Sequence, residues 1–123
     1  MHAVLVDTDI AIDYLRGSRE AADLVGPLWK SDRAYISILS VYELYAGMRP
    51  AEAEDTERFI DACHIDTVTL EIAKEAGEMY RQWRAKGVTL TSVDCLVAAT
   101  ATVNRRKIAT RNKNHYPQKG LLL

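Results

Sequence analysis

The chain has 123 residues, of which 48% are hydrophobic and 27% are charged, and this is the size and composition of one folded domain. It contains no run of about 18 apolar residues, which excludes a transmembrane helix. The N-terminus has no basic region and reaches Asp7 early, so we expect no signal peptide and a cytoplasmic location. Cys63 and Cys95 form no C-x-x-C motif, which argues against a disulfide framework and a zinc knuckle. The sequence therefore predicts a single domain over residues 1–123.

The charge is unevenly distributed along the chain. The net charge is −1, Asp94 is the last acidic residue, and six Lys and Arg residues follow it, so residues 1–94 carry −7. An acidic body with a basic C-terminal segment suits a site that holds cations and faces a polyanion. The alternative is a solvated basic helix end followed by a loop.

Hydrophobic periodicity predicts strands and helices in alternation. The predicted strands cover residues 3–6, 34–37, 65–68 and 108–110, and residues 121–123 form a last edge strand or a frayed tail. The predicted helices cover residues 8–16, 18–28, 40–46, 51–62, 70–86 and 92–104, with Pro27 bending or ending the second. This alternation predicts an α/β fold with a parallel sheet and helices on both faces.

Three acidic residues occupy equivalent places in this pattern. Asp7 directly follows the first strand, whereas Glu43 and Asp94 lie on the predicted first turns of two helices. Parallel α/β sheets bind ligands beyond the carboxyl ends of their strands. We therefore expect these three carboxylates to converge on one cleft.

Helix capping offers another explanation for each acid alone. Ser40-x-x-Glu43 and Thr91-x-x-Asp94 resemble capping boxes, and the helix dipole favours an acid in the first turn by roughly 0.3–1 kcal/mol. The three acids together, each flanked by apolar residues, would suffer mutual repulsion and desolvation. A hard cation such as Mg²⁺ or Mn²⁺ would relieve both costs.

Four segments resemble motifs of the PIN-domain ribonucleases, and in particular of the VapC toxins. They occur in the family's order and span nearly the whole chain. The segments are Val6-Asp7-Thr8-Asp9-Ile10, residues 37–47 (SILSVYELYAG), residues 92–101 (SVDCLVAATA), and Thr110-Arg111-Asn112-Lys113-Asn114-His115-Tyr116.

The resemblance implies a PIN-like three-layer sandwich around a central parallel sheet of about four to five strands. It also implies a homodimer with Mg²⁺- or Mn²⁺-dependent endoribonuclease activity, the toxin of a type II toxin–antitoxin pair, restrained by a cognate antitoxin protein. Asp7, Glu43 and Asp94 match the family's catalytic, metal-binding acids. The chain departs from the pattern where many relatives carry a fourth acid, because Asn112 stands there. We therefore keep Asn112 and Asp9 as additional candidate metal ligands.

The remaining polar residues of these motifs are candidates for RNA binding. Hydroxyl, amide and basic side chains beside the acids can contact phosphates or bases, whereas Tyr116 is expected to pack in the interior. The candidate substrate-binding residues are Thr8, Thr110, Arg111, Asn112, Lys113 and His115.

Three other functions remain open on the sequence. A receiver-like module would need an Asp after the second strand, which residues 34–37 lack. A PIN domain that only binds RNA or a protein is compatible with Asn112. The third alternative is a PIN nuclease that acts in RNA maturation or on DNA. The sequence identifies neither the RNA that is cleaved nor the number of metal ions.

Overall fold

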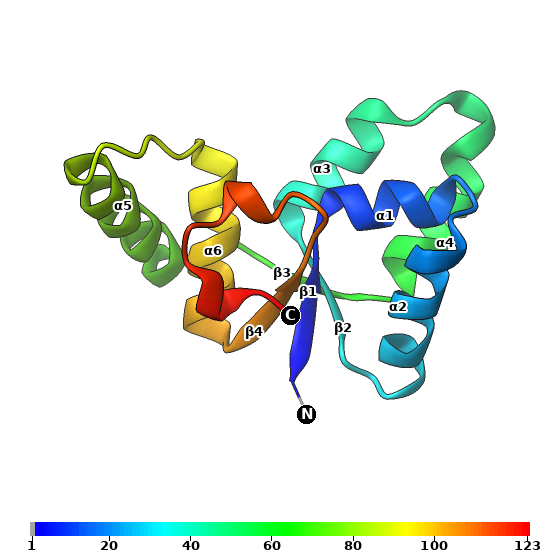
Figure 1. The fold of residues 1–123 in the computed structure, drawn as a ribbon. Coiled ribbons are helices and arrows are strands. Elements are labelled where there is room, and N and C mark those ends of the chain that lie inside the picture. The colour runs from blue at the N-terminus through cyan, green and yellow to red at the C-terminus, as the bar shows by residue number, and fades with distance from the viewer. Residues whose placement is uncertain (1) are drawn as a thin grey trace.

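The computed structural model describes residues 2–123 and contains one parallel β-sheet (Figure 1). Its strands are β1 (Ala3–Val6), β2 (Ala34–Ser37), β3 (His64–Asp66) and β4 (Arg106–Ala109), in the spatial order β3-β2-β1-β4. All three strand pairings are parallel. The predicted parallel sheet is thus confirmed, with four strands.

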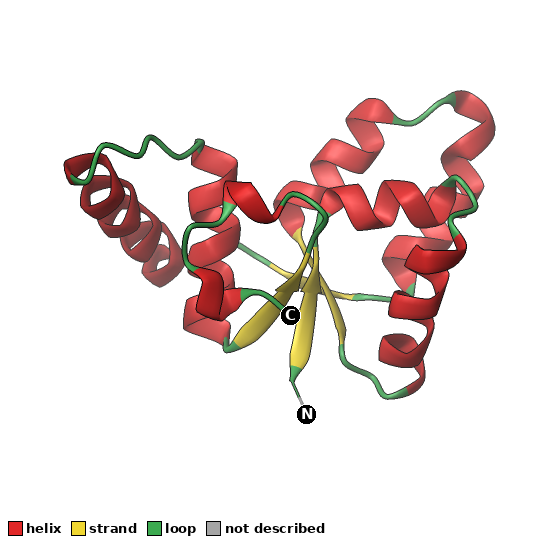
Figure 2. Cartoon of the chain, viewed as in Figure 1, coloured by secondary structure: helices red, strands yellow, loops and turns green. Residues whose placement is uncertain are grey.

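Six α-helices cover the two faces of this sheet. They are α1 (Thr8–Leu15), α2 (Arg19–Lys30), α3 (Ile38–Gly47), α4 (Ala53–Asp61), α5 (Leu70–Ala85) and α6 (Ser92–Asn104). Three short 3₁₀ turns, η1 (Pro50–Glu52), η2 (Lys113–His115) and η3 (Lys119–Leu121), complete the described elements. Figures 1 and 2 show α1 to α4 on one side of the sheet and α5 and α6 on the other, which confirms the predicted three-layer sandwich.

The core divides into two clusters because successive side chains of a strand point to opposite faces. Val4 and Val6 of β1 pack against the helices α1 to α4, whereas Leu5 packs against α5 and α6. Three aromatic rings, Tyr14, Trp29 and Phe59, close the first cluster with centroids 5.1–5.4 Å apart. Both faces of the sheet are therefore buried, as its short apolar strands require.

Polar caps fix where several helices begin. Ser18 accepts a hydrogen bond from the amide of Ala21 and starts α2, and Thr91 accepts one from the amide of Asp94 and starts α6. Asp7 is the N-cap of α1. The cap expected at Thr91 is thus confirmed.

The start of α3 differs from the prediction. The helix begins at Ile38, and Ser37 is its cap, accepting a hydrogen bond from the amide of Leu39. Ser40 is therefore inside the helix and forms no capping box, and Glu43 lies on the second turn instead of the first. The reason is that β2 pairs with β3 as far as Ser37, so the chain passes from strand to helix without a loop.

Smaller differences concern the other boundaries. Pro27 does not end α2, which continues for one more turn to Lys30. The third strand begins at His64 and ends at Asp66, and the fourth begins earlier than predicted, at Arg106. Near the C-terminus, Leu122 makes an isolated parallel bridge to Ile108 beside β4.

Within residues 2–123, none of the helices has the length and apolar character needed to cross a membrane.

Candidate active site

The predicted site residues gather at the carboxyl edge of the sheet. Asp7 directly follows β1, and Thr110 directly follows β4. Glu43 comes from α3, the helix that follows β2, and Asp94 from the first turn of α6. Four separate stretches of sequence thus supply polar side chains to one edge.

The Asp7 carboxylate is half-buried and is held at both oxygens. Its Oδ1 accepts a hydrogen bond from the amide of Thr8 at 2.9 Å, and its Oδ2 accepts one from the Tyr116 hydroxyl at 2.9 Å. Burial raises the pKa of Asp7 above its ordinary value, and these two hydrogen bonds oppose that rise. Asp7 is therefore a carboxylate whose charge is costly in its present surroundings.

Glu43 is tied to Asp7 through Thr8. The Thr8 hydroxyl lies 2.7 Å from Glu43 Oε1 and 2.8 Å from the hydroxyl of the buried Ser40. Because a hydroxyl donates only one hydrogen, Thr8 donates to the Glu43 carboxylate and accepts from Ser40. The residue next to Asp7 thus fixes the position of the second acid.

Asp94 faces His115, with 3.6 Å between Oδ2 and Nδ1. Asp94 and Asp7 both lie near the phenol of Tyr116. Burial raises the pKa of Tyr116 most, and the charges of Asp7, Asp94 and Asp9 add to that rise. The negative charges of Asp7, Asp9 and Asp94 therefore all act on the region around the Tyr116 hydroxyl.

Asp9 holds the loop that follows β4. Its Oδ2 accepts hydrogen bonds from the backbone amides of Arg111 at 2.8 Å and Asn112 at 3.2 Å. The Thr110 hydroxyl lies 3.4 Å from both carboxylate oxygens, and it also accepts from the Asn112 amide at 3.0 Å. In this structure the Asp9 carboxylate and the Thr110 hydroxyl fix the loop.

Residues 111–115 line a polar hollow of ≈ 360 Å³ at the surface. Arg111 makes an ion pair with Asp13 of α1, with Nε 2.5 Å from Oδ2. The side chains of Asn112, Lys113 and His115 are exposed. Arg111, Lys113 and His115 form a basic rim, and His115 lies beside Asp94.

Comparison with known proteins identifies the family of this chain. The PIN domain family model matches residues 4–119. Ribonuclease VapC10 of Mycobacterium tuberculosis is 37% identical over 114 residues, which are 93% of this chain and 86% of the relative. Ribonuclease VapC19 of the same organism is 38% identical over 114 residues, 92% of this chain and 91% of the relative. The chain belongs to the VapC family of PIN-domain proteins.

A solved structure supports the same fold for this VapC chain. The DNA-bound VapBC of Salmonella typhimurium aligns with a TM-score of 0.85, covering 99% of this chain and 96% of that chain at 20% identity. This chain therefore shares its overall fold with that solved structure.

Three contacts at the VapC site were not predicted from the sequence. They are the Ser40 hydroxyl on Thr8, the Asp13 carboxylate on Arg111, and the Tyr116 hydroxyl on Asp7. Tyr116 was expected to pack, which its ring does, but its hydroxyl reaches the site as well. A buried tyrosine usually needs a partner for its hydroxyl, and that rule was the available signal.

The chemistry of the acids fits a divalent cation. Carboxylate oxygens are the ligands that Mg²⁺ and Mn²⁺ prefer, and none of the ion pairs among residues 2–123 involves Asp7 or Glu43. The same residues contain no group of three His, Cys, Asp or Glu side chains arranged closely enough to enclose a metal ion. Each acid is turned instead toward a protein group: Asp7 toward Tyr116, Glu43 toward Thr8 and Asp94 toward His115.

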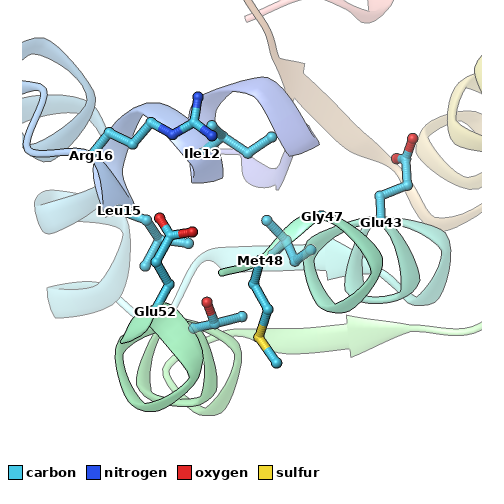
Figure 3. Close-up of a pocket in the computed structure, with 9 residues that line it drawn as sticks. Ile12, Leu15, Arg16, Glu43, Gly47, Met48 and Glu52 are labelled. Atoms are coloured by element: carbon cyan, nitrogen blue, oxygen red, sulfur yellow. The ribbon is translucent and has the colours of Figure 1, made fainter. Parts of the chain in front are cut away.

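A small pocket of ≈ 40 Å³ adjoins Glu43 between α1, α3 and α4. Figure 3 shows Glu43 on one side of it and Arg16 and Glu52 on the opposite side. Thr56 also lines the pocket, is 1% exposed, and its hydroxyl has no hydrogen-bond partner among residues 2–123. A buried hydroxyl of this kind normally binds water or another polar group, so the space beside Glu43 is suited to solvent.

Proposed function

We propose that this VapC chain is an Mg²⁺- or Mn²⁺-dependent endoribonuclease, a single PIN domain over residues 1–123 that acts in the cytoplasm as the toxin of a toxin–antitoxin pair. The observation that carries the proposal is the gathering of Asp7, Glu43 and Asp94 at one sheet edge beside the basic loop 111–115. An acidic centre with a basic rim matches the needs of phosphodiester hydrolysis. The ribonuclease names of the relatives VapC10 and VapC19 agree with it.

Asp7, Glu43 and Asp94 are the residues that would hold the cation, with Asn112 as a further ligand. When bound, a divalent ion lowers the pKa of a coordinated water and neutralises the charge on phosphate oxygens. Asp9 is the weaker candidate, because its Oδ2 already accepts two backbone amides and its Oδ1 accepts the amide of Ile10 with the Thr110 hydroxyl 3.4 Å away, whereas each Asp7 oxygen accepts one hydrogen bond.

The chain's own residues would perform the remaining tasks. Glu43, held by Thr8, orients the attacking water and accepts its proton. Arg111 and Lys113 bind the phosphates that flank the scissile bond, and Asn112 and His115 contact the substrate beside them. Thr8 and Thr110 support this surface indirectly, since their hydroxyls are bonded to Glu43 and Asp9.

The first test is cleavage of RNA by the purified protein in Mg²⁺, in Mn²⁺ and in EDTA. We expect cleavage in both metals, none in EDTA, and products without cyclic phosphate ends, because water and not the ribose hydroxyl attacks. Asp94→Asn should lower kcat/KM by at least about 100-fold, the upper end of what is lost when a metal ligand's partner is removed. Cleavage that persists in EDTA would contradict the proposal. A folded protein that binds RNA without cleaving it would favour a binding module, with Asn112 as the departure responsible.

Thr8→Val should lower kcat/KM on RNA by roughly 10- to 100-fold, because Glu43 loses the hydroxyl that positions it. Thr8→Ser keeps that hydroxyl and should retain most of the activity, which makes it the matched control. Steady-state kinetics on a short RNA measure both variants. Equal activity of Thr8→Val and the wild type would show that the Thr8–Glu43 contact plays no part in the reaction.

A protein with this activity requires an inhibitor, and we propose that a basic side chain of a cognate antitoxin enters the acidic centre and competes with the cation. The VapBC structures among the relatives of this fold make such a partner reasonable.

We also propose a homodimer. The large apolar side chains exposed on α3, Ile38, Tyr42 and Tyr45, are suited to a protein interface. Sedimentation analysis of the purified chain tests the dimer, and a complex with antitoxin that remains fully active would contradict the competition.

A further inference from the structure

The Tyr116 side chain combines a core position with a polar contact to the site. Its ring is 1% exposed and packs in the cluster that contains Leu5, Cys95 and Ile108. Its hydroxyl donates to Asp7 Oδ2 at 2.9 Å. The core therefore sets the position of a hydrogen-bond donor that reaches the first acid of the site.

The two hydrogen bonds on Asp7 fix the orientation of its carboxylate. Thr8 binds Oδ1 from the backbone, and Tyr116 binds Oδ2 from the opposite end of the sequence, 109 residues away. Each oxygen of a carboxylate can accept about two hydrogen bonds, so each keeps one site free for another partner. A carboxylate fixed in this way cannot turn freely about its Cβ–Cγ bond.

The loop that carries Tyr116 is itself anchored to the site. Asp9 accepts the amides of Arg111 and Asn112, and His115 faces Asp94. The Tyr116 hydroxyl is thus held from two sides, by the loop and by the core packing of its ring.

We propose that Tyr116 is a positioning residue that orients the Asp7 carboxylate toward the divalent cation of the site. This inference rests on the proposed function, since it assigns Asp7 to that cation. Outer partners of metal ligands typically contribute 10- to 100-fold to metal affinity. Phe in place of Tyr116 would fill the same core space without orienting Asp7.

The test is calorimetric titration of Mn²⁺ into the wild type and into Tyr116→Phe, with Tyr14→Phe as the control. Tyr14 is a partly buried tyrosine of the other cluster, packed edge-on against Trp29. We expect Mn²⁺ to bind Tyr116→Phe about 10- to 100-fold more weakly than the wild type, and Tyr14→Phe to bind as the wild type does. Excess Mn²⁺ should restore RNA cleavage by Tyr116→Phe, which a purely structural defect would not allow.

The melting temperature in EDTA reports separately whether Tyr116→Phe is folded. If Tyr116→Phe is not folded, the near-ultraviolet difference spectrum on adding Mg²⁺ replaces the titration of that variant. A tyrosine signal is expected in the wild type and not in Asp7→Asn. A folded Tyr116→Phe with wild-type Mn²⁺ affinity, or no tyrosine signal in the wild type, overturns this inference alone. A wild type that binds no Mn²⁺ overturns the proposed function as well.

Discussion

Asp7→Asn should abolish RNA cleavage while leaving the protein folded and at least as stable as the wild type. Activity is expected to fall on the order of 1,000-fold, as when a group that stabilises developing charge is removed from an active site. Asn keeps the shape of Asp and remains a good helix cap, so α1 should still begin at Thr8. Loss of activity without loss of the fold is the combination expected of a functional carboxylate.

The stability of Asp7→Asn should depend on pH in a defined direction. Burial raises the pKa of Asp7 above 3.8, so the folded state holds this proton more tightly than the unfolded state. The wild type therefore loses stability as the pH rises from about 3.8 through the raised pKa, and the Asn variant does not. The difference in melting temperature, variant minus wild type, should be larger at neutral pH than at acidic pH. Part of this gain in stability should be lost, because the Asn side chain has a single oxygen to accept the hydrogen bonds of two donors, Thr8 and Tyr116.

The control for these measurements is Asp23→Asn, which replaces an exposed acid of α2. It should leave RNA cleavage at the wild-type rate. An Asp7→Asn protein that cleaves RNA at the wild-type rate would remove Asp7 from the site. One that melts far below the wild type would assign Asp7 a structural role.

Arg106→Met should produce the largest loss of stability, roughly 3–5 kcal/mol, because it leaves a buried charge without its partner. Arg106 begins β4 and makes two contacts to Asp66 at the end of β3, with Nε–Oδ2 3.1 Å and Nη2–Oδ1 3.2 Å. Asp66 is 8% exposed and the Arg106 side chain 19%. The guanidinium also lies 3.7 Å from the ring centroid of Tyr35. Because Arg106 is on β4 and Asp66 is on β3, the ion pair joins the two outer strands of the sheet.

Urea denaturation measures this effect, and the ion pair between Arg58 and Glu54 gives the comparison. That pair is exposed on α4 at a spacing of four residues, so Arg58→Met should cost no more than about 0.5 kcal/mol. The double variant Asp66→Asn, Arg106→Met should recover part of the loss, because no charge is then left unpaired. Equal losses for Arg106→Met and Arg58→Met would mean that the buried pair contributes no more than a surface pair.

Much of the architecture could be predicted because local signals and topology agreed. The apolar run before Asp7, the cap at Thr91, and the alternation of strands and helices are local features, and each is present in the structure. From the rule that parallel sheets bind ligands at their carboxyl edge, we predicted that Asp7, Glu43 and Asp94 lie together at that edge.

What the sequence could not show depends on contacts between distant residues. Ser37 and Ser40 are equally good caps by composition, and the pairing of Ser37 with Asp66 decides between them. The same is true of Asp9, which the family resemblance offered as a candidate metal ligand but which accepts two amides of the loop after β4. The Tyr116 hydroxyl is the clearest case, since its partner is 109 residues away.

The central proposal is that Asp7, Glu43 and Asp94 belong to one divalent-metal site. The measurement that tests it most directly is calorimetric titration of Mn²⁺ into the wild type and into Asp7→Asn, Glu43→Gln and Asp94→Asn. We expect saturable binding by the wild type and a large loss of affinity in each variant, with all three still folded in EDTA. Wild-type affinity in Glu43→Gln and Asp94→Asn would contradict a shared site.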